Sequence, residues 1–587
     1  MAARKGPKRI GEGLMMHRMS FPPEAGDLRG VPQFSNWPAV YVLNNDDDVY
    51  VGESLNVESR LGAHSKNPAK EHLENTKVII DEQFNKSVCL DLESLLIQLF
   101  AGEAKYEVLN RNSGITDADY FDRARYTERF TQIFDALRKE GLFDQDLVTI
   151  RNSDLFKFSP FKSLNEKQEH AVEMLLRALS DAESHGRQFR AVVQGAAGTG
   201  KTVVLVFLLK FLADLGNGSD ISTPEIEDDA VFPWRTADAY SNLERLRLGL
   251  VVPQQSLRTT LKRVFALTPG LKDVPVLDPW QVGQSDEKFD LLVVDEGHRL
   301  SRRANQSSAK RNTDFREISE KLYGEYTDDV TQYDWITTMS RHTVVVVDPD
   351  QSVRTSDLGA EYVQRLVCEG EETSAVYTLE QQMRMANSDQ YLPFLRGLLF
   401  GASPKPAAAP DFGEYRFELF TDFGAMQDEI LRLNADAGLS RTVAGYAWEW
   451  TTRGKRKDPT AYDIELDGRR LRWNSVAEDW INHPGSEREM GSIHTVQGYD
   501  LNYCGVVFGS EISCDPATGQ VVIHRENYKD RKGKEGRGKT RLSDEDLRKY
   551  IVNIYLVLMS RGIRGTFVYC VNPGLRELFS RYLHVAN

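Results

Sequence analysis

Short, continuous runs of Val, Leu and Ile alternate with longer amphipathic stretches from about residue 161 to the end of the chain. An uninterrupted aliphatic strand is buried on both faces, which is typical of a parallel sheet covered by helices. The chain contains enough such strands for two sheets, so the pattern predicts an α/β fold with two lobes, at residues 161–375 and 376–587. The predicted strands are FRAVVQG, RLGLVVP, FDLLVVDE and HTVVVVD in the first lobe and RTVAGYA, CGVVFG and GTFVYCV in the second.

A smaller α+β domain is predicted at residues 36–115. AVYVL and DVYVG form two short strands joined by the turn NNDDD, and LNVESRLGAH and VCLDLESLLIQLF have the apolar spacing of helices. Residues 1–35 are basic and lack periodicity, which predicts a flexible tail, and the charged residues 116–160 predict a helical connector. Three polar segments predict surface insertions, at residues 216–240, 301–315 and 523–546.

The composition is that of an ordinary globular protein, with 41% hydrophobic and 27% charged residues. Wholesale disorder and collagen-like architecture are therefore excluded. The 73 basic and 87 acidic residues give a net charge of −14, which argues against a protein that coats itself in nucleic acid. A nucleic-acid partner would then depend on a few positive grooves within an acidic body.

Five cysteines, none of them in a C-x-x-C pair, argue against a disulfide framework and against a zinc ribbon. No apolar stretch approaches the roughly 20 residues of a membrane span. The basic N-terminus, MAARKGPKRI, is not followed by the apolar core of a signal peptide. We therefore expect a cytoplasmic protein without a membrane partner.

A complete phosphate-binding loop follows the strand RAVVQ and opens the helix KTVVLVFLLKFL. Its glycines let backbone N–H groups turn toward phosphate, and the start of the helix adds a partial positive charge. Lys201 is expected to reach the β- and γ-phosphates of ATP, and Thr202 to hold Mg²⁺. The expected nucleotide-binding residues of the loop are Gly195, Gly198, Thr199, Gly200, Lys201 and Thr202.

Two adjacent carboxylates, Asp295 and Glu296, follow the aliphatic strand LLVV. The carboxyl end of a buried strand is where open α/β sheets place their ligands. Asp295 is expected to hold Mg²⁺, and Glu296 to orient or activate the attacking water. His298 follows closely, and the sequence allows two roles for it, which are coupling the nucleotide to nucleic acid and capping a loop.

Further segments around these motifs resemble superfamily-one helicases, and more closely the Schlafen-type group of bacterial DNA/RNA helicases. The segments are NEKQEHAV, VVVVDPDQS, LEQQMRM, AGYAWEW, GSIHTVQGYDLNYCGVVFG and IYLVLMSRGIRGTFVY, and they occur in the order found in the family. The resemblance covers roughly residues 161–575. It implies that the two parallel-sheet lobes are the RecA-like lobes of a P-loop NTPase.

The same resemblance assigns roles to single residues. It implies that Gln168 reads adenine, that Gln351 together with Asp348 senses the γ-phosphate, and that Arg384 and Arg561 are arginine fingers. Two arginines across a cleft would stabilise the charge on the transferring phosphoryl group. His494, Thr495, Gln497 and Gly498 match the family's fifth motif. For Gln168 and His494 an ordinary solvated role remains open.

A basic run departs from the family pattern at residues 525–541, where eight basic and three acidic residues give a local charge of +5. One interpretation is a solvated loop. The other is a grip on the phosphate backbone of nucleic acid, because Lys and Arg supply most of the non-specific affinity. A loop that serves both purposes is the reading we favour.

The small N-terminal domain resembles the GIY-YIG endonuclease domain over about residues 37–115. Ala39-Val40-Tyr41 stands where the family has Gly-Ile-Tyr, and Tyr50-Val51-Gly52 where it has Tyr-Ile-Gly. The first glycine and the isoleucine are replaced by alanine and valine, which removes no chemical group. The remaining matches are Arg60, His64, Glu93 and Asn110.

The resemblance implies a metal-dependent attack on a phosphodiester. Glu93 would be the metal ligand, for Mg²⁺ or Mn²⁺, since hard cations prefer carboxylate oxygen. Tyr41 would act as the general base with Tyr50 orienting it, and His64 could assist proton transfer. Arg60 would hold the scissile phosphate, and Asn110 would fix the loop of the active site.

Together the motifs predict an ATP-dependent helicase or translocase fused to an endonuclease that cleaves nucleic acid, with DNA favoured over RNA. Fusions of this kind suggest anti-phage defence or DNA repair in bacteria, by fold analogy alone. Two alternatives stay open, which are an ATP-gated nucleic-acid sensor that does not unwind and a non-cutting protein that recognises branched nucleic acid. ATP and Mg²⁺ are the expected cofactors, and the sequence leaves polarity and oligomeric state open.

Overall fold

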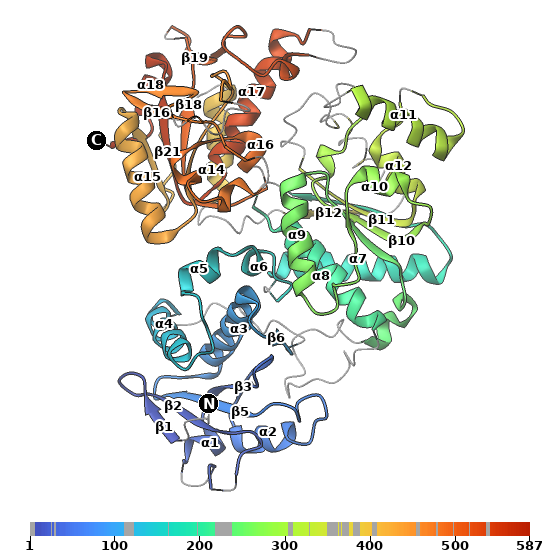
Figure 1. Ribbon diagram of the computed structural model, residues 1–587, viewed down its shortest axis with the longest axis vertical. Coiled ribbons are helices and arrows are strands. Elements are labelled where there is room, and N and C mark those ends of the chain that lie inside the picture. The colour runs from blue at the N-terminus through green and yellow to red at the C-terminus, as the bar shows by residue number, and fades with distance from the viewer. Residues whose placement is uncertain are drawn as a thin grey trace. The chain divides into compact units, whose positions relative to one another are not determined.

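The computed structural model describes most of residues 6–586 and divides into two compact units (Figure 1). One unit contains residues 1–169, 206–239 and 263–273, and the other contains residues 170–205, 240–262 and 274–587. Between residues 349 and 387 the structure describes only 358, 362, 366 and 375–379. The other residues outside the description are 1–5, 25, 29–30, 111–122, 162–163, 196–197, 218–236, 303–308, 328, 402–407, 453–457, 459, 477–478, 497, 516, 536–540 and 587.

The N-terminal domain is built on a six-stranded sheet with the order β1-β2-β5-β3-β4-β6. Its pairs are antiparallel except for β4 with β6. Side chains alternate along β3, so that Val40 and Val42 pack with α3 on one face while Tyr41 and Leu43 pack on the other. The strands are β1 (Gly6–Arg9), β2 (Leu14–Ser20), β3 (Ala39–Asn44), β4 (Asp48–Ser54), β5 (Asn75–Asp81) and β6 (Glu107–Val108), and the helices are α1 (Gln33–Asn36), α2 (Val57–His64) and α3 (Lys86–Glu103).

The prediction of a flexible tail at residues 1–35 is wrong for the residues of β1 and β2, which form two strands of the sheet. β2 pairs with β5 along its whole length, from Leu14 opposite Asp81 to Ser20 opposite Asn75. Its sequence, LMMHRMS, places buried apolar residues beside polar ones, but methionines and basic residues obscured that pattern. The basic composition was therefore a poor guide to order in this segment.

Within residues 123–160, the described part of the predicted connector, the chain forms α4 (Arg123–Lys139), α5 (Leu147–Asn152) and α6 (Asp154–Lys157). Phe130, Phe134 and Phe143 from this segment belong to the same apolar cluster as α3. Phe143 stacks on Phe100 of α3 with the ring centroids 4.4 Å apart. These helices therefore complete the core of the N-terminal domain rather than merely connecting it to the next one.

The first predicted parallel sheet is confirmed, with the strand order β12-β7-β11-β10-β8-β9. β12 extends it past the predicted boundary at residue 375. The strands are β7 (Arg190–Gly195), β8 (Leu248–Val251), β9 (Val276–Leu277), β10 (Phe289–Val294), β11 (Ser340–Val347) and β12 (Ala375–Leu379). The helices of this lobe are α7 (Glu166–Ser184), α8 (Lys201–Gly216), α9 (Gln255–Leu267), α10 (Pro279–Gln284), α11 (Ala309–Tyr323) and α12 (Gln332–Thr338).

The second predicted parallel sheet is also confirmed, with the order β17-β14-β18-β21-β13-β22. Helix α15 packs on one face, and α14 and α17 pack on the other (Figure 1). The strands are β13 (Arg416–Phe420), β14 (Ser440–Ala444), β17 (Met490–Ser492), β18 (Leu501–Phe508), β21 (Gly562–Cys570) and β22 (His584–Ala586). The helices are α14 (Ser388–Phe400), α15 (Phe423–Ala437), α16 (Ile493–Val496), α17 (Asp544–Met559) and α18 (Pro573–Ser580).

Two short hairpins and five short 3₁₀ segments complete the described elements. The hairpins are β15 (Ile464–Leu466) with β16 (Arg469–Leu471) and β19 (Ile512–Cys514) with β20 (Val521–Ile523). The 3₁₀ segments are Ala237–Leu243, Gly297–Arg299, Trp480–Asn482, Ser486–Arg488 and Lys532–Lys534. None of the helices within the described ranges is long and apolar enough to cross a membrane.

The second lobe buries one carboxyl group, that of Glu511, completely. The Tyr555 hydroxyl donates to its Oε1. Its Oε2 is also buried and has no hydrogen-bond partner within the part of the chain that is described. Burial raises the pKa of Glu511 to about 7. Because this value lies above that of an unfolded chain, the group stabilises the fold below about pH 4.5, and that contribution is lost as the pH rises through about 7.

Glu511→Gln is therefore expected to stabilise the second lobe at pH 8 by roughly 3 kcal/mol and to have little effect at pH 5. Glutamine resembles the protonated carboxyl and keeps an acceptor for Tyr555. Denaturant unfolding at both pH values measures the change. Glu526→Gln is the matched control, since that side chain is 74% exposed. Equal effects at the two pH values would contradict this account.

Candidate functional site

The predicted phosphate-binding loop joins a central strand to a helix, because β7 ends at Gly195 and α8 begins at Lys201. Gly198 and Gly200 have φ of +85° and +76°, a region of backbone conformation that favours glycine. Residues 196–197 lie outside the description. Lys201 is buried, and its Nζ donates to the Gly195 carbonyl at 2.9 Å. The lysine thus lies folded over the loop, with its charge at the end of the sheet.

Asp295 directly follows β10 and is completely buried. Thr202 Oγ1 donates to Asp295 Oδ2 at 2.8 Å, and Lys201 Nζ lies 3.6 Å from Asp348 Oδ2. Burial, and after it the negative charge of Glu296, raises the pKa of Asp295 to about 6. A hydroxyl and a carboxylate oxygen side by side are the hard donors that Mg²⁺ prefers. The two predicted ligands therefore fit a magnesium ion bound with ATP.

The buried side chain of His298 lies beside Glu296. The backbone N–H of Asp348 donates to His298 Nδ1 at 3.2 Å, so a neutral His298 carries its proton on Nε2, which lies 3.0 Å from Glu296 Oε2. Burial acts to raise the pKa of Glu296, but the adjacent His298 and the charges of Lys201 and Arg299 outweigh it and hold this pKa well below its usual range. The lowered pKa favours the ionised form of Glu296, and the bond from Asp348 to His298 joins the ends of β10 and β11.

The structure brings most of the predicted ATP-site residues together. These are Gly195, Gly198, Thr199, Gly200, Lys201, Thr202, Asp295 and Glu296. Gln168 is buried at the start of α7. Its side-chain Oε1 accepts from the backbone N–H of Asn165 at 3.1 Å, and its backbone N–H donates to Asn165 Oδ1. This reciprocal pair of hydrogen bonds caps the start of the helix. The recognition of adenine by Gln168 stays a prediction. Gln351, Arg384 and Gln497 lie outside the described residues.

Arg561 is only 1% exposed, although it was predicted to be an arginine finger. Its Nε donates to the Val557 carbonyl at 3.0 Å, and its Nη1 donates to the Tyr499 carbonyl at 3.4 Å. The guanidinium thus bonds to its own lobe, and a γ-phosphate contact would require these bonds to be exchanged. Nearby, the ring of His494 lies 5.7 Å from that of Tyr446.

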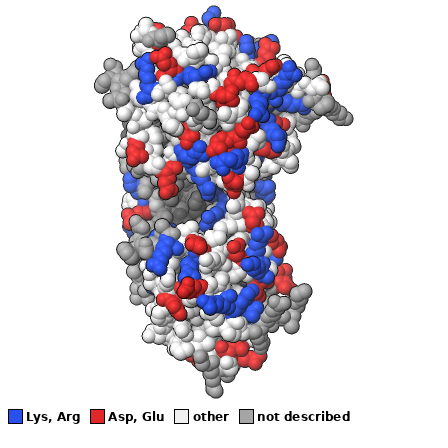
Figure 2. Space-filling model, turned by 90° about the vertical axis from the view of Figure 1, so that its left-hand side faces the viewer, with Lys and Arg blue, Asp and Glu red and all other residues white. Residues whose placement is uncertain are grey.

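The described part of the basic run at residues 525–541 is partly neutralised. Arg525 Nε donates to Asp544 Oδ1 at 2.7 Å, and Arg541 lies 3.8 Å from the same oxygen. On the face shown in Figure 2, Lys and Arg form separate groups with Asp and Glu between them. Acidic neighbours such as Asp544 therefore offset part of the positive charge of this run.

In the N-terminal domain, Tyr41 of β3, Tyr50 of β4 and His64 of α2 lie together. Tyr41 Oη and His64 Nε2 are 2.8 Å apart, and the rings of Tyr50 and His64 are 5.1 Å apart. All three side chains are buried. Gly52 allows this arrangement, because a Cβ at that position would lie 2.3 Å from the Tyr41 hydroxyl oxygen.

Asn110 fixes the strand that carries Tyr50. Its Oδ1 accepts from the Val51 N–H at 2.9 Å, and its Nδ2 donates to the Val51 carbonyl at 2.7 Å. The side-chain amide thus satisfies both main-chain groups of one residue between Tyr50 and Gly52. A role in holding the loop of the site, as the resemblance implies, is compatible with these bonds.

Glu93 lies on α3, where it is partly buried and close to Glu53. Burial, and then the charge of Glu53, raises the pKa of Glu93 to about 8, while Lys86 and Arg60 act to lower it. The Glu53 side chain is 8% exposed; its Oε1 lies 2.5 Å from Lys86 Nζ, and its Oε2 is buried without a hydrogen-bond partner in the described ranges. Two neighbouring carboxylates with an unsatisfied oxygen fit a hard divalent cation that completes its shell with water.

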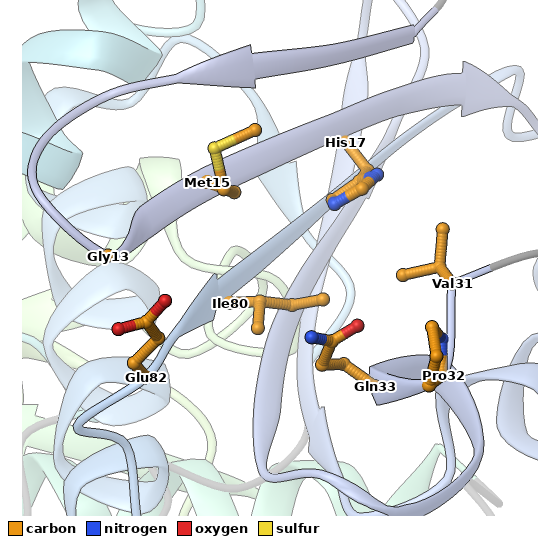
Figure 3. A pocket seen from close by; sticks show the side chains of 8 residues that line it. All are labelled: Gly13, Met15, His17, Val31, Pro32, Gln33, Ile80 and Glu82. Carbon is orange, nitrogen blue, oxygen red and sulfur yellow. The ribbon is translucent and has the colours of Figure 1, made fainter.

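A pocket of about 280 Å³ lies on the sheet face that carries Tyr41. His17 is opposite Val78 in the sheet, and Val78 is opposite Tyr41, so the three side chains share one face. Figure 3 shows the residues around the pocket, which are Gly13, Met15, His17, Val31, Pro32, Gln33, Ile80 and Glu82. This part of the face therefore remains open beside the buried tyrosines.

The family of the larger part of the chain is shown by one match. The DNA/RNA helicase domain of Schlafen group 3 matches residues 190–572, which is more than half of the chain. This chain belongs to the Schlafen group 3 helicase family. The matched range begins with β7 and ends just after β21, so the helicase domain contains the phosphate loop and the Asp295–Glu296 pair. The family implies ATP with Mg²⁺, and residues 36–115 lie outside the matched range.

Other relatives of the chain are more distant. An uncharacterized protein of Saccharomyces cerevisiae, YPL245W, is 26% identical over 454 residues, which cover 71% of this chain and 91% of the yeast protein. A crystal structure of the Pif1 helicase from Candida albicans covers 70% of this chain and 95% of its own, with 10% identity and a TM-score of 0.27. A structure of Pif1 helicases at forked double-stranded DNA covers 59% of this chain and 86% of its own, with 14% identity and a TM-score of 0.21. Neither superposition is close enough to transfer residues or substrates.

Sequence reasoning missed several residues beside the candidate sites. In the helicase domain Arg299, whose charge acts on Glu296, donates from Nη1 to Gln254 Oε1 at 3.0 Å. In the N-terminal domain it missed Glu53, Lys70 and Lys86. Glu53 directly follows the matched Tyr-Val-Gly, which was a usable signal. Lys70 and Lys86 have no motif that would have revealed them.

Proposed function

We propose that this protein is an ATP-driven motor that acts on nucleic acid and is fused to a metal-dependent endonuclease. The observation that carries the motor is the buried assembly of Lys201, Thr202, Asp295 and Glu296 at the ends of β7 and β10. Family membership supports it independently. DNA is the favoured substrate, and anti-phage defence or DNA repair is the proposed setting.

In this proposal, Lys201 neutralises part of the negative charge on the β- and γ-phosphates, and the N–H groups of the loop hold these phosphates in place. Mg²⁺ would neutralise phosphate charge when bound by Thr202 and Asp295. Glu296, whose ionised form its surroundings favour, would orient the attacking water. Arg384 and Arg561 would add positive charge once the two lobes close on ATP.

The nuclease half rests on two groups of the N-terminal domain, which are Tyr41 with His64 and Glu93 with Glu53. A bound Mg²⁺ or Mn²⁺ would polarise the scissile phosphate. Glu93 would hold this ion, with Glu53 beside it, and Tyr41 would take the proton of the attacking water. Arg60, on α2, would bind the phosphate.

One observation favours the second candidate, a domain that recognises nucleic acid without cutting it. Tyr41 is 0% exposed and Tyr50 is 4% exposed. A general base must contact its substrate, so cutting requires nucleic acid to uncover Tyr41.

The ATP-gated sensor would differ from the motor in a strand-displacement assay, where ATP turnover would rise with nucleic acid while no strand is released.

The test is one preparation incubated with Mg²⁺ or Mn²⁺, with and without ATP, on single-stranded, duplex and forked DNA and RNA. Phosphate release, strand displacement and cleavage are scored in parallel. We expect nucleic acid to stimulate ATP turnover and cleavage to depend on the metal ion. Absence of cleavage on every substrate would leave the binding domain as the function of residues 36–115.

A further inference from the structure

Lys70 contacts two of the predicted nuclease residues, His64 and Tyr50, although no motif includes it. The chain turns back after α2 through two hydrogen bonds, from the Asn67 N–H to the His64 carbonyl at 3.0 Å and from the Lys70 N–H to the Asn67 carbonyl at 2.9 Å. These turns bring the Lys70 side chain over His64. Lys70 is only 4% exposed, which is rare for a lysine unless its charge meets partners.

The ammonium group of Lys70 contacts two residues of the predicted nuclease site, His64 and Tyr50. Its Nζ lies 3.2 Å from His64 Nδ1 and 3.5 Å from the centroid of the Tyr50 ring. The negative face of the ring attracts the cation. An ammonium group has donors only, so His64 Nδ1 must be the acceptor of this hydrogen bond.

The direction of the first hydrogen bond fixes the next one. A neutral imidazole with an accepting Nδ1 carries its proton on Nε2. His64 Nε2 lies 2.8 Å from the Tyr41 hydroxyl oxygen, so His64 donates and Tyr41 accepts. An imidazolium is disfavoured, since it would turn an N–H toward the ammonium group of Lys70.

We propose that Lys70 is a positioning residue of the nuclease site, which fixes the Nε2–H tautomer of His64 and so keeps a hydrogen bond aimed at the Tyr41 oxygen. The inference rests on the proposed nuclease function. A tyrosine that acts as a base must exist as a phenolate, which only accepts hydrogen bonds. The donor from His64 stabilises that form, and the buried charge of Lys70 adds to it through a medium that screens poorly.

Substitution of Lys70 separates this role from mere packing. Lys70→Met keeps the length of the side chain but removes donor and charge, and should lower cleavage by about 10- to 100-fold. Lys70→Arg keeps both and should restore a large part of the activity. Lys66→Met is the control, because Lys66 is exposed on the same segment. Thermal unfolding of each variant identifies any that fail to fold.

Imidazole ¹⁵N spectra of the full chain supply a readout independent of cleavage. The protein has 11 histidines, and His64→Gln identifies the signal of interest. We expect the Nε2–H tautomer in the unsubstituted protein and loss of that preference in Lys70→Met. An Nδ1–H tautomer in the unsubstituted protein, or unchanged cleavage by a folded Lys70→Met, would overturn the inference. If Glu93→Gln also leaves cleavage intact, the proposed nuclease function itself is wrong.

Discussion

Lys201→Ala is expected to lower ATP turnover by about 100- to 1000-fold, the usual cost of removing a group that stabilises charge in a transition state. Lys201 is buried over the phosphate loop, between the Gly195 carbonyl and the Asp348 carboxylate. Its removal leaves Asp295 and Glu296 without their nearest positive charge from the loop, so phosphate binding suffers as well. Phosphate release, measured with and without nucleic acid, gives the effect.

The matched control is Lys210→Ala on the same helix, α8. Lys210 forms an ion pair with Asp214 one turn further along. This variant should keep its ATP turnover, since the pair belongs to the helix and not to the loop. Strand displacement should be lost only with Lys201→Ala. Normal turnover in a folded Lys201→Ala protein would refute the assignment of the ATP site.

Glu93→Gln is expected to reduce cleavage about a thousandfold or more while it leaves ATP turnover unchanged. A metal ion supplies several kcal/mol of charge stabilisation, and an amide is a much poorer ligand than a carboxylate. Burial raises the pKa of Glu93 to about 8. Only the ionised carboxylate binds a cation well, so cleavage should also rise with pH up to about 8.

Glu58→Gln serves as the control for this experiment, because Glu58 is an exposed carboxylate of the same domain. The variants are compared on one forked substrate across pH 6 to 9, at fixed metal concentration. A Glu93→Gln protein that cuts as well as the Glu58→Gln protein would remove Glu93 from the site. A flat pH profile would instead contradict only the buried state of its carboxyl group.

The sequence predicts the strands whose aliphatic runs are unbroken, such as β10 and β11. It does not predict strands that are short or that carry charge on one face. β9 has two residues, and β17 and β22 have three each. β13, RFELF, carries Arg416 and Glu418, which form an ion pair with each other. In such strands the fold is decided by neighbours in space, which local spacing does not encode.

The candidate sites show the same division. The phosphate loop and the Asp295–Glu296 pair could be predicted, since each is a contiguous motif with a fixed structural context. The bond from the Asp348 N–H to His298 joins residues 50 positions apart. Lys70 meets His64 only because the chain turns back after α2. Contacts of this kind depend on the path of the backbone, so no local sequence pattern predicts them.

Residues 1–35 have a further consequence for the solubility of the N-terminal domain. A chain that began at residue 36 would lack β1 and β2, and β5 would become the edge of the sheet. The main-chain groups from Asn75 to Asp81 that now pair with β2 would then face water. That edge carries the consecutive apolar residues Val78, Ile79 and Ile80. An uncovered apolar edge strand pairs readily with another copy of itself, so the first strands protect this domain from self-association.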